Sequence, residues 1–138
     1  MSVVEMEHVL VLSDHVEQAR EFYCEVVGLT LGERPPLEFP GYWLYAGETP
    51  CLHVAQRGPY LAHAERLGLS VAGGDGPGPV DHIAFRATGY PETRARPQRK
   101  GVPTVLNTVA GGGPRQVFVE DPSGVRIELN FSHEAKGR

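Results

Sequence analysis

The sequence predicts an α+β fold built from two copies of one βαβββ unit. In each half of the chain, a short β-branched strand precedes an amphipathic helix and a pair of strands. The landmarks also return at a nearly constant offset, because His82 follows His8 by 74 residues and Gly101 follows Gly28 by 73. Since one such unit cannot bury its sheet face alone, we expect two curved mixed sheets paired around a cavity.

The first expected strand and helix lie near the N-terminus. Glu7–Leu12 is short, apolar and β-branched, which is typical of a strand. Asp14 and Glu17 have the spacing of a capping box, so we expect a helix to begin here. Apolar residues then recur at helical spacing until Gly28, which is placed to end the helix.

The rest of the first module, residues 1–72, contains two further strands. We predict them over Tyr42–Ala46 and Cys51–Gln56, joined by the turn Gly47–Pro50. A short helix is expected over Tyr60–Leu67. The glycine- and proline-rich residues 73–79 are predicted to be a flexible linker.

The second module, residues 80–138, repeats this order. Asp81–Arg86 is the expected opening strand, and Pro91–Lys100 is the expected helix, which Pro97 should break or shorten. Gln116–Glu120 and Val125–Phe131 are predicted to form a hairpin around a tight turn containing glycine.

Composition excludes several functional classes. The net charge of −4 does not favour nucleic-acid binding, which usually requires a basic patch. No apolar run is long enough to suggest a membrane span, and the N-terminus lacks the pattern of a signal peptide, so we expect a cytoplasmic protein. The two cysteines do not form a disulfide framework.

Four side chains of metal-ligand type occupy repeat-equivalent positions. His8 and His82 lie on the opening strands, and His53 and Glu128 lie on the closing strands, 75 residues apart. Imidazole and carboxylate together suit Fe, Mn, Ni or Zn. The repeat therefore predicts one divalent-metal site, although a single strand histidine is more often a hydrogen-bonded core residue.

The strand that carries Glu128 alternates apolar and polar residues. Along Val125–Phe131 every odd position is apolar and every even position is polar. In an edge strand this pattern would separate the interior from solvent, whereas in a module with a concave site it separates a core face from a cavity face. The metal-ligand partners favour the second interpretation.

The hairpin register adds candidate substrate-binding residues. A tight turn places Phe118 opposite Glu128 and Gln116 opposite Asn130. By the repeat, we expect Tyr42 and Leu44 to occupy the matching places in the first module.

Arg115 follows a run of three glycines and a proline. Either this segment is a plain connection, or it is a mobile loop at the cavity mouth in which Arg115 meets an anionic substrate. The remaining histidines, His15, His63 and His133, are expected to be exposed to solvent.

These motifs resemble the vicinal oxygen chelate superfamily, which includes glyoxalases, bleomycin resistance proteins and extradiol dioxygenases. The segments that carry the resemblance are EHVLVLSD, FYCEVVGL, VDHIAF and VFVEDPSGVRIELNF. The resemblance implies that the metal ligands fall on His8, His82 and Glu128, with His53 at the fourth place. It also implies a small-molecule substrate with two adjacent oxygens and, in many members, a homodimer.

The residue at the fourth ligand position, which is His53 in this chain, distinguishes the subfamilies. Glyoxalases resemble this chain but usually have Glu where it has His53, and extradiol dioxygenases use a nearby His as an acid/base. Those dioxygenases also carry a Tyr ten residues before the carboxylate ligand, where this chain has Phe118. His53 is therefore expected to be either a ligand or a catalytic acid/base.

The sequence predicts metal-dependent lyase or isomerase chemistry. The metal would act as a Lewis acid, and His53, Tyr42 and Glu120 are the candidates for moving protons. Two alternatives stay open: an extradiol-type dioxygenase using Fe(II) and O₂, and a metal-free protein that binds a small molecule to confer resistance.

Overall fold

The computed structural model describes residues 5–69, 80, 82–109 and 113–132. Contacts divide the chain into two compact units, Met1–Cys24 with Leu29–Gly73, and Glu25–Gly28 with Gly74–Arg138. The linker expected at 73–79 and the tail histidine His133 lie outside the described residues. No helix in the described ranges is long and apolar enough to span a membrane.

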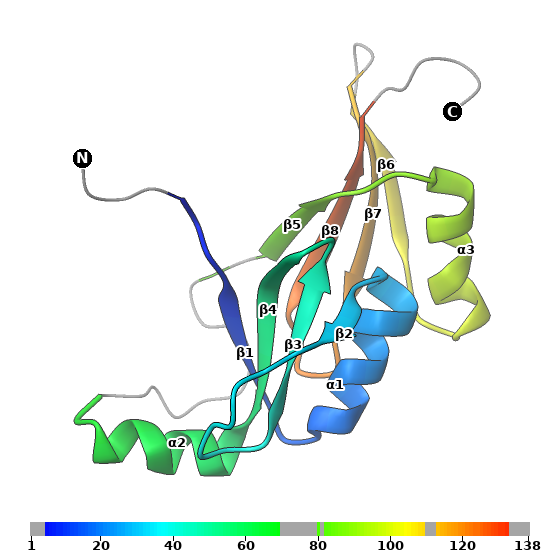
Figure 1. Ribbon diagram of the computed structural model, residues 1–138. Coiled ribbons are helices and arrows are strands. Elements are labelled where there is room, and N and C mark those ends of the chain that lie inside the picture. The colour runs from blue at the N-terminus through cyan, green and yellow to red at the C-terminus, as the bar shows by residue number, and fades with distance from the viewer. Residues whose placement is uncertain (1–4, 70–79, 81, 110–112, 133–138) are drawn as a thin grey trace. The chain divides into compact units, whose positions relative to one another are not determined.

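The first unit contains a four-stranded mixed sheet. The strand order is β1-β4-β3-β2, with β1 parallel to β4 and the other neighbours antiparallel (Figure 1). This is the expected βαβββ connectivity, with the short edge strand β2 as the fourth member. The strands are β1 (Val9–Ser13), β2 (Thr30–Gly32), β3 (Gly41–Ala46) and β4 (Thr49–Gln56).

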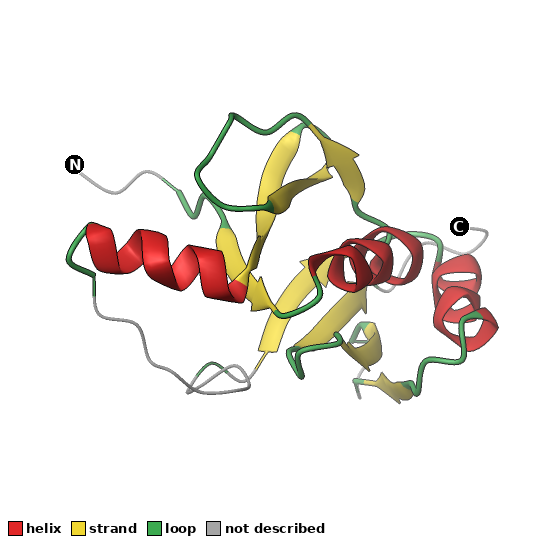
Figure 2. Ribbon diagram, turned by 90° about the horizontal axis from the view of Figure 1, so that it is seen from below, coloured by secondary structure: helices red, strands yellow, loops and turns green. Residues whose placement is uncertain are grey.

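The helices of the first unit depart from the sequence prediction in detail. The helix α1 (Val16–Phe22) continues into one π-helical turn, η1 (Tyr23–Val27), before Gly28. Gly28 has a φ of 101°, so the expected glycine stop is confirmed. The helix α2 (Arg57–Arg66) begins directly after β4, three residues earlier than expected (Figure 2).

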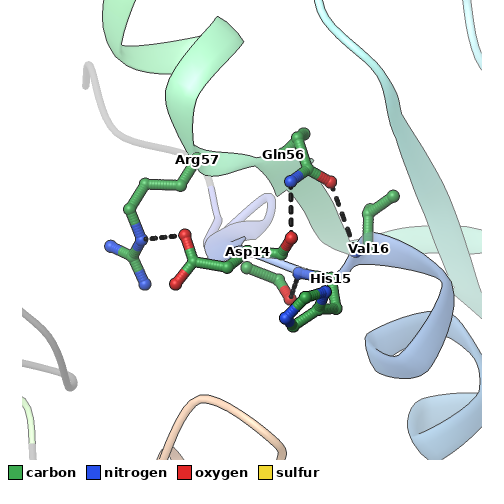
Figure 3. Close-up of polar contacts among 6 residues, drawn as sticks. Asp14, His15, Val16, Gln56 and Arg57 are labelled. Carbon is green, nitrogen blue, oxygen red and sulfur yellow. Dashed lines mark hydrogen bonds and ion pairs between the residues drawn. The ribbon is translucent and has the colours of Figure 1, made fainter.

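The capping box predicted at the start of α1 is not formed. Instead the amide of Gln56 bridges the loop: its Oε1 accepts from the Val16 N–H at 3.3 Å, and its Nε2 donates to the Asp14 carbonyl at 2.6 Å (Figure 3). The Asp14 carboxylate turns away to Arg57, at 3.0 Å. A side chain distant in sequence thus replaces the local cap, because β1 and β4 are neighbours.

The second unit has the same sheet order, β5-β8-β7-β6, with β5 parallel to β8. Repeated connectivity in both units confirms the fold class expected from the repeat. The elements are β5 (His82–Arg86), α3 (Tyr90–Arg99), β6 (Val105–Thr108), β7 (Arg115–Glu120) and β8 (Arg126–Phe131) (Figure 1).

Pro97 does not break α3, contrary to the sequence expectation. The helix runs for ten residues through it. Proline removes one N–H donor, but Pro97 lies in the second half of the helix and its ring is fully buried. Burial of the ring against the core offsets part of the cost of about 3 kcal/mol that proline has in a helix interior.

Both sheets have one face turned to a core. On β8 the alternation is as expected, because Ile127, Leu129 and Phe131 are buried while Glu128 and Asn130 keep partial exposure. The same period applies to β7, whereas Leu52–Ala55 of β4 are buried without alternation. In the second unit, Gln116, Phe118 and Glu128 therefore lie on the sheet face opposite the core.

Candidate metal centre and its surroundings

In the second unit, His82 and Glu128 are brought together. Glu128 lies in the middle of β8, and His82 is the first residue of the parallel neighbour β5. Their side chains meet with His82 Nε2 3.3 Å from Glu128 Oε1. The carboxylate is largely covered, at 14% exposure, while the imidazole is 41% exposed.

Two amides hold the other oxygen of Glu128. Its Oε2 accepts from Nδ2 of Asn130 at 2.7 Å and from Nε2 of Gln116 at 3.2 Å. Gln116 also donates to the Asn130 side chain at 3.0 Å and accepts from Asn107 at 2.8 Å. The network fixes the carboxylate with Oε1 directed at His82, as the amides around a ligating carboxylate do.

The predicted register of the second hairpin is confirmed. Phe118 lies opposite Glu128, and Gln116 lies opposite Asn130. Phe118 and Glu120 also line a cavity of about 530 Å³, together with residues from the segment 102–105. Glu120 is exposed and lies opposite Arg126, two strand positions from the carboxylate of Glu128. A small molecule in this cavity would therefore lie beside Phe118.

In the first unit, His53 lies in a stack of three rings. His8 covers one face at a centroid distance of 3.8 Å, and Trp43 is stacked with it at 4.1 Å. His53 itself is only 9% exposed. His8 precedes β1 by one residue and remains more accessible than His53.

The hydrogen bonds assign the tautomers of both imidazoles. His8 Nδ1 donates to the Glu7 carboxylate at 2.8 Å, and His53 Nε2 donates to the Pro50 carbonyl at 3.0 Å. Burial, followed by the charge of His8, lowers the pKa of His53. Nε2 of His8 and Nδ1 of His53 are therefore the ring nitrogens that remain for a metal, while the other nitrogen of each ring is engaged with an oxygen acceptor.

Tyr42 and Leu44 do not occupy the matching places of the first hairpin, because Trp43 lies opposite His53 and Gly41 lies opposite Ala55. A β-bulge causes the difference: Pro50 and Cys51 of β4 together lie opposite Tyr45 of β3. Beyond the bulge the pairing is offset by one residue, which changes the residue that faces His53. Trp43 is therefore the counterpart of Phe118, and the sequence pattern did not show the bulge that makes it so.

Tyr42 instead points to α1. Its hydroxyl donates to the carboxylate of Glu17, which also pairs with Arg20 at 3.1 Å. The hydrogen bond to Glu17 raises the pKa of Tyr42, and the same bond, with that of Arg20, lowers the pKa of Glu17. Tyr42 thus contacts Glu17 of α1 and does not face the His53 ring.

Arg115 also lies on the core-facing side of its strand. Its guanidinium stacks over the ring of Tyr90 on α3, 4.0 Å from the centroid. Gln116, the next residue on β7, faces Glu128. Since neighbouring residues on a strand point to opposite faces, Arg115 does not share the face of the metal-ligand candidates.

The donor set suits a divalent metal. His8, His53, His82 and Glu128 supply three imidazoles and a carboxylate. Within either unit, the described residues bring only two donors together, His8 with His53 and His82 with Glu128.

The model of one protein superfamily matches most of the chain. The model of the Glyoxalase/Bleomycin resistance protein/Dioxygenase superfamily matches residues 5–129. The chain belongs to this superfamily. One relative within the glyoxalase superfamily is Glyoxylase I 4 of Arabidopsis thaliana, 29% identical over 133 residues, which cover 94% of this chain and 71% of that protein.

Solved structures of the glyoxalase superfamily share the fold. A lactoylglutathione lyase from Agrobacterium tumefaciens matches with a TM-score of 0.66 and 20% identity, covering 95% of this chain and 94% of that one. An antibiotic binding protein from Streptomyces sp. CB03234 matches with the same score and identity, covering 96% and 98%. The superfamily fold thus serves both an enzyme and a binding protein among these neighbours.

Proposed function

We propose that the protein is a divalent-metal-dependent lyase or isomerase acting on a small molecule with two adjacent oxygens. One observation carries the proposal: each unit pairs two metal-ligand side chains at repeat-equivalent positions. His8 stacks on His53 at 3.8 Å, and His82 contacts Glu128 at 3.3 Å. Bound there, a metal would supply Lewis-acid stabilisation of negative charge on a substrate oxygen.

The chain's own residues have distinct roles in this proposal. Glu128, His8, His53 and His82 hold the metal, and the amides of Gln116 and Asn130 orient the carboxylate. Phe118 lines the cavity and, from its place opposite Glu128, would shield the carboxylate from water when a substrate is bound. Glu120 lines the same cavity and is the candidate that accepts or returns a proton at its carboxylate.

Phe118 favours isomerase or lyase chemistry over ring cleavage. The extradiol dioxygenases that the chain resembles have a phenol at this place, and Phe118 provides no hydroxyl group beside Glu128. A metal-free binding function is the second candidate. The antibiotic binding neighbour and the stacked rings of Trp43 and His53 support it.

Metal binding tests the proposal directly. Purified protein should bind about one divalent ion per site, and Glu128→Ala should sharply lower the metal affinity because the carboxylate ligand is lost. Glu92→Ala is the matched control, since Glu92 is an exposed helix residue paired with Arg99. Titration calorimetry and elemental analysis give the affinity and the stoichiometry. Equal affinity in Glu128→Ala and the parent protein would contradict the proposed centre.

A further inference from the structure

The first unit contains a second cavity, beside the ring stack. It has a volume of about 500 Å³ and is open to solvent on one side. Its size suits a small single-ring molecule. The lining residues are Glu33, Arg34, Pro35, Trp43 and Tyr45.

Two aromatic side chains form one wall of this cavity. Trp43 stacks on His53 and also lines the cavity, so its ring is held by the same stack that covers the metal-ligand candidate. Tyr45 lies across Gly32, where an added Cβ would come within 2.4 Å of its ring, and its hydroxyl donates to the Glu33 carbonyl at 2.7 Å. The wall is therefore flat and fixed in place.

Arg34 supplies a positive charge next to this wall. Its Nη2 donates to the Phe39 carbonyl at 2.6 Å, and its guanidinium lies 5.4 Å from the centre of the Phe39 ring. Nη2 also lies 3.2 Å from the position that a Cβ on Gly41 would take, which places it over β3 near Trp43. The Arg34 charge contributes to the lowered pKa of His53.

No carboxylate in the described ranges pairs with Arg34. Partial burial lowers the pKa of its guanidinium, because the cation has lost part of its hydration. A planar guanidinium in this situation matches a carboxylate, which it can bind through two parallel hydrogen bonds. The exposed carboxylate of Glu33 in the same cavity disfavours ligands with several negative charges, such as phosphates.

We propose that this cavity binds a planar ring that carries a single carboxylate, with the ring on Trp43 and the carboxylate on Arg34. The inference rests on the proposed function in one respect: this group would be the end of the substrate that lies away from the metal. It assigns the substrate class as small aromatic acids. The contacts themselves need no metal, so they can be tested on metal-free protein.

Trp43 is the only tryptophan of the chain, so its fluorescence reports on this cavity. Chelator-treated full-length protein is titrated with benzoate, with benzyl alcohol and with cyclohexanecarboxylate. Benzoate should bind most tightly, because the alcohol lacks the charge and the cyclohexane lacks a planar ring. Arg34→Gln should weaken benzoate binding by roughly tenfold or more and leave benzyl alcohol unchanged.

Matched variants separate binding from folding. Arg66→Gln removes an exposed arginine of the same unit, paired with Glu38, and should bind benzoate like the parent. Arg34→Lys should restore part of the affinity lost in Arg34→Gln, provided that circular dichroism shows both variants folded. Benzoate binding equal to that of benzyl alcohol, or unchanged by Arg34→Gln, would overturn the inference.

The same samples distinguish this inference from the proposed function. Metal binding that is lost in Glu128→Ala, together with no preference for benzoate, would overturn the aromatic-acid cavity and leave the metal centre standing. Benzoate binding that depends on Arg34, in a protein that binds no divalent metal, would support the cavity and contradict the metal-dependent enzyme.

Discussion

His53 is the residue whose role decides the chemistry of the candidate centre. Rings cover it on both faces, and its Nε2 donates to the Pro50 carbonyl. Its remaining nitrogen, Nδ1, can either bind a metal or exchange a proton with a substrate. Burial, the largest influence, lowers the pKa of the imidazole and so favours the neutral form that a metal ligand and a general base both use.

Replacing His53 distinguishes the two roles. If His53 is a ligand, as we propose, His53→Ala should weaken metal binding by more than the roughly 10- to 100-fold typical of a residue behind the ligands. Metal affinity is measured by competition with a chromophoric chelator. His63→Ala is the control, because His63 lies on α2 and pairs with Glu38.

An unchanged metal affinity in His53→Ala would indicate the acid/base role instead. Turnover would then be slower by about 10²–10⁴-fold once a substrate is known. The isomerase proposal would lose a ligand and with it much of its support.

At the scale of residues, the sequence predicted which residues lie opposite each other in the second hairpin but not in the first. The alternation on β8 was sufficient to predict that Phe118 and Gln116 lie opposite Glu128 and Asn130. Trp43 was missed, because the bulge between β3 and β4 depends on how the two strands pair and leaves no periodic signal in either one. Arg34 lies in an irregular segment, where periodicity carries no information.

At the scale of elements, contacts between residues distant in sequence determine features that local sequence patterns did not predict. The sequence predicted the connectivity of both modules and the strands β1, β3, β4, β5, β7 and β8, because apolar periodicity depends on the sheet that buries it. It did not locate the edge strands β2 and β6. It did not predict the cap of α1, where Gln56 acts from 40 residues away. The sequence also overestimated the helix-breaking effect of Pro97. Burial of its ring in the core of the second unit outweighs the low helix propensity of proline.

Gln56→Ala should destabilise the first unit. The substitution removes both hydrogen bonds that tie the start of α1 to β4, so the free energy of unfolding should fall by about 1 kcal/mol, as for a lost helix cap. Urea unfolding followed by circular dichroism measures it. Gln18→Ala, an exposed change within α1, should leave the stability nearly unaltered, and equal effects of the two would show that the bridge contributes nothing.

At the scale of the whole molecule, each sheet ends in an exposed strand. On β6 the side chains of Val105 and Leu106 are 64% and 47% exposed, and Leu31 on β2 is 46% exposed. Such apolar edges favour pairing with another chain. We therefore predict a homodimer.

Light scattering at micromolar concentration should therefore give twice the mass of 15.0 kDa expected for one chain. Val105→Lys should shift the protein toward the monomer, because a charged edge opposes strand pairing. Lys100→Ala, a change outside the strands, is the control. A monomeric parent protein with metal bound would contradict the dimer.

The bulge between β3 and β4 also shows how two copies of one module can diverge, because the hairpin of the second unit pairs without one. Two residues of β4 lie opposite Tyr45, so every pair beyond the bulge is offset by one position while the two strands stay paired. A hairpin continued from Ala46 and Thr49 without this offset would place Tyr42 opposite His53, whereas Trp43 has that place here. Duplicated modules can acquire unlike binding surfaces in this way, one half at a time, while their common architecture is preserved.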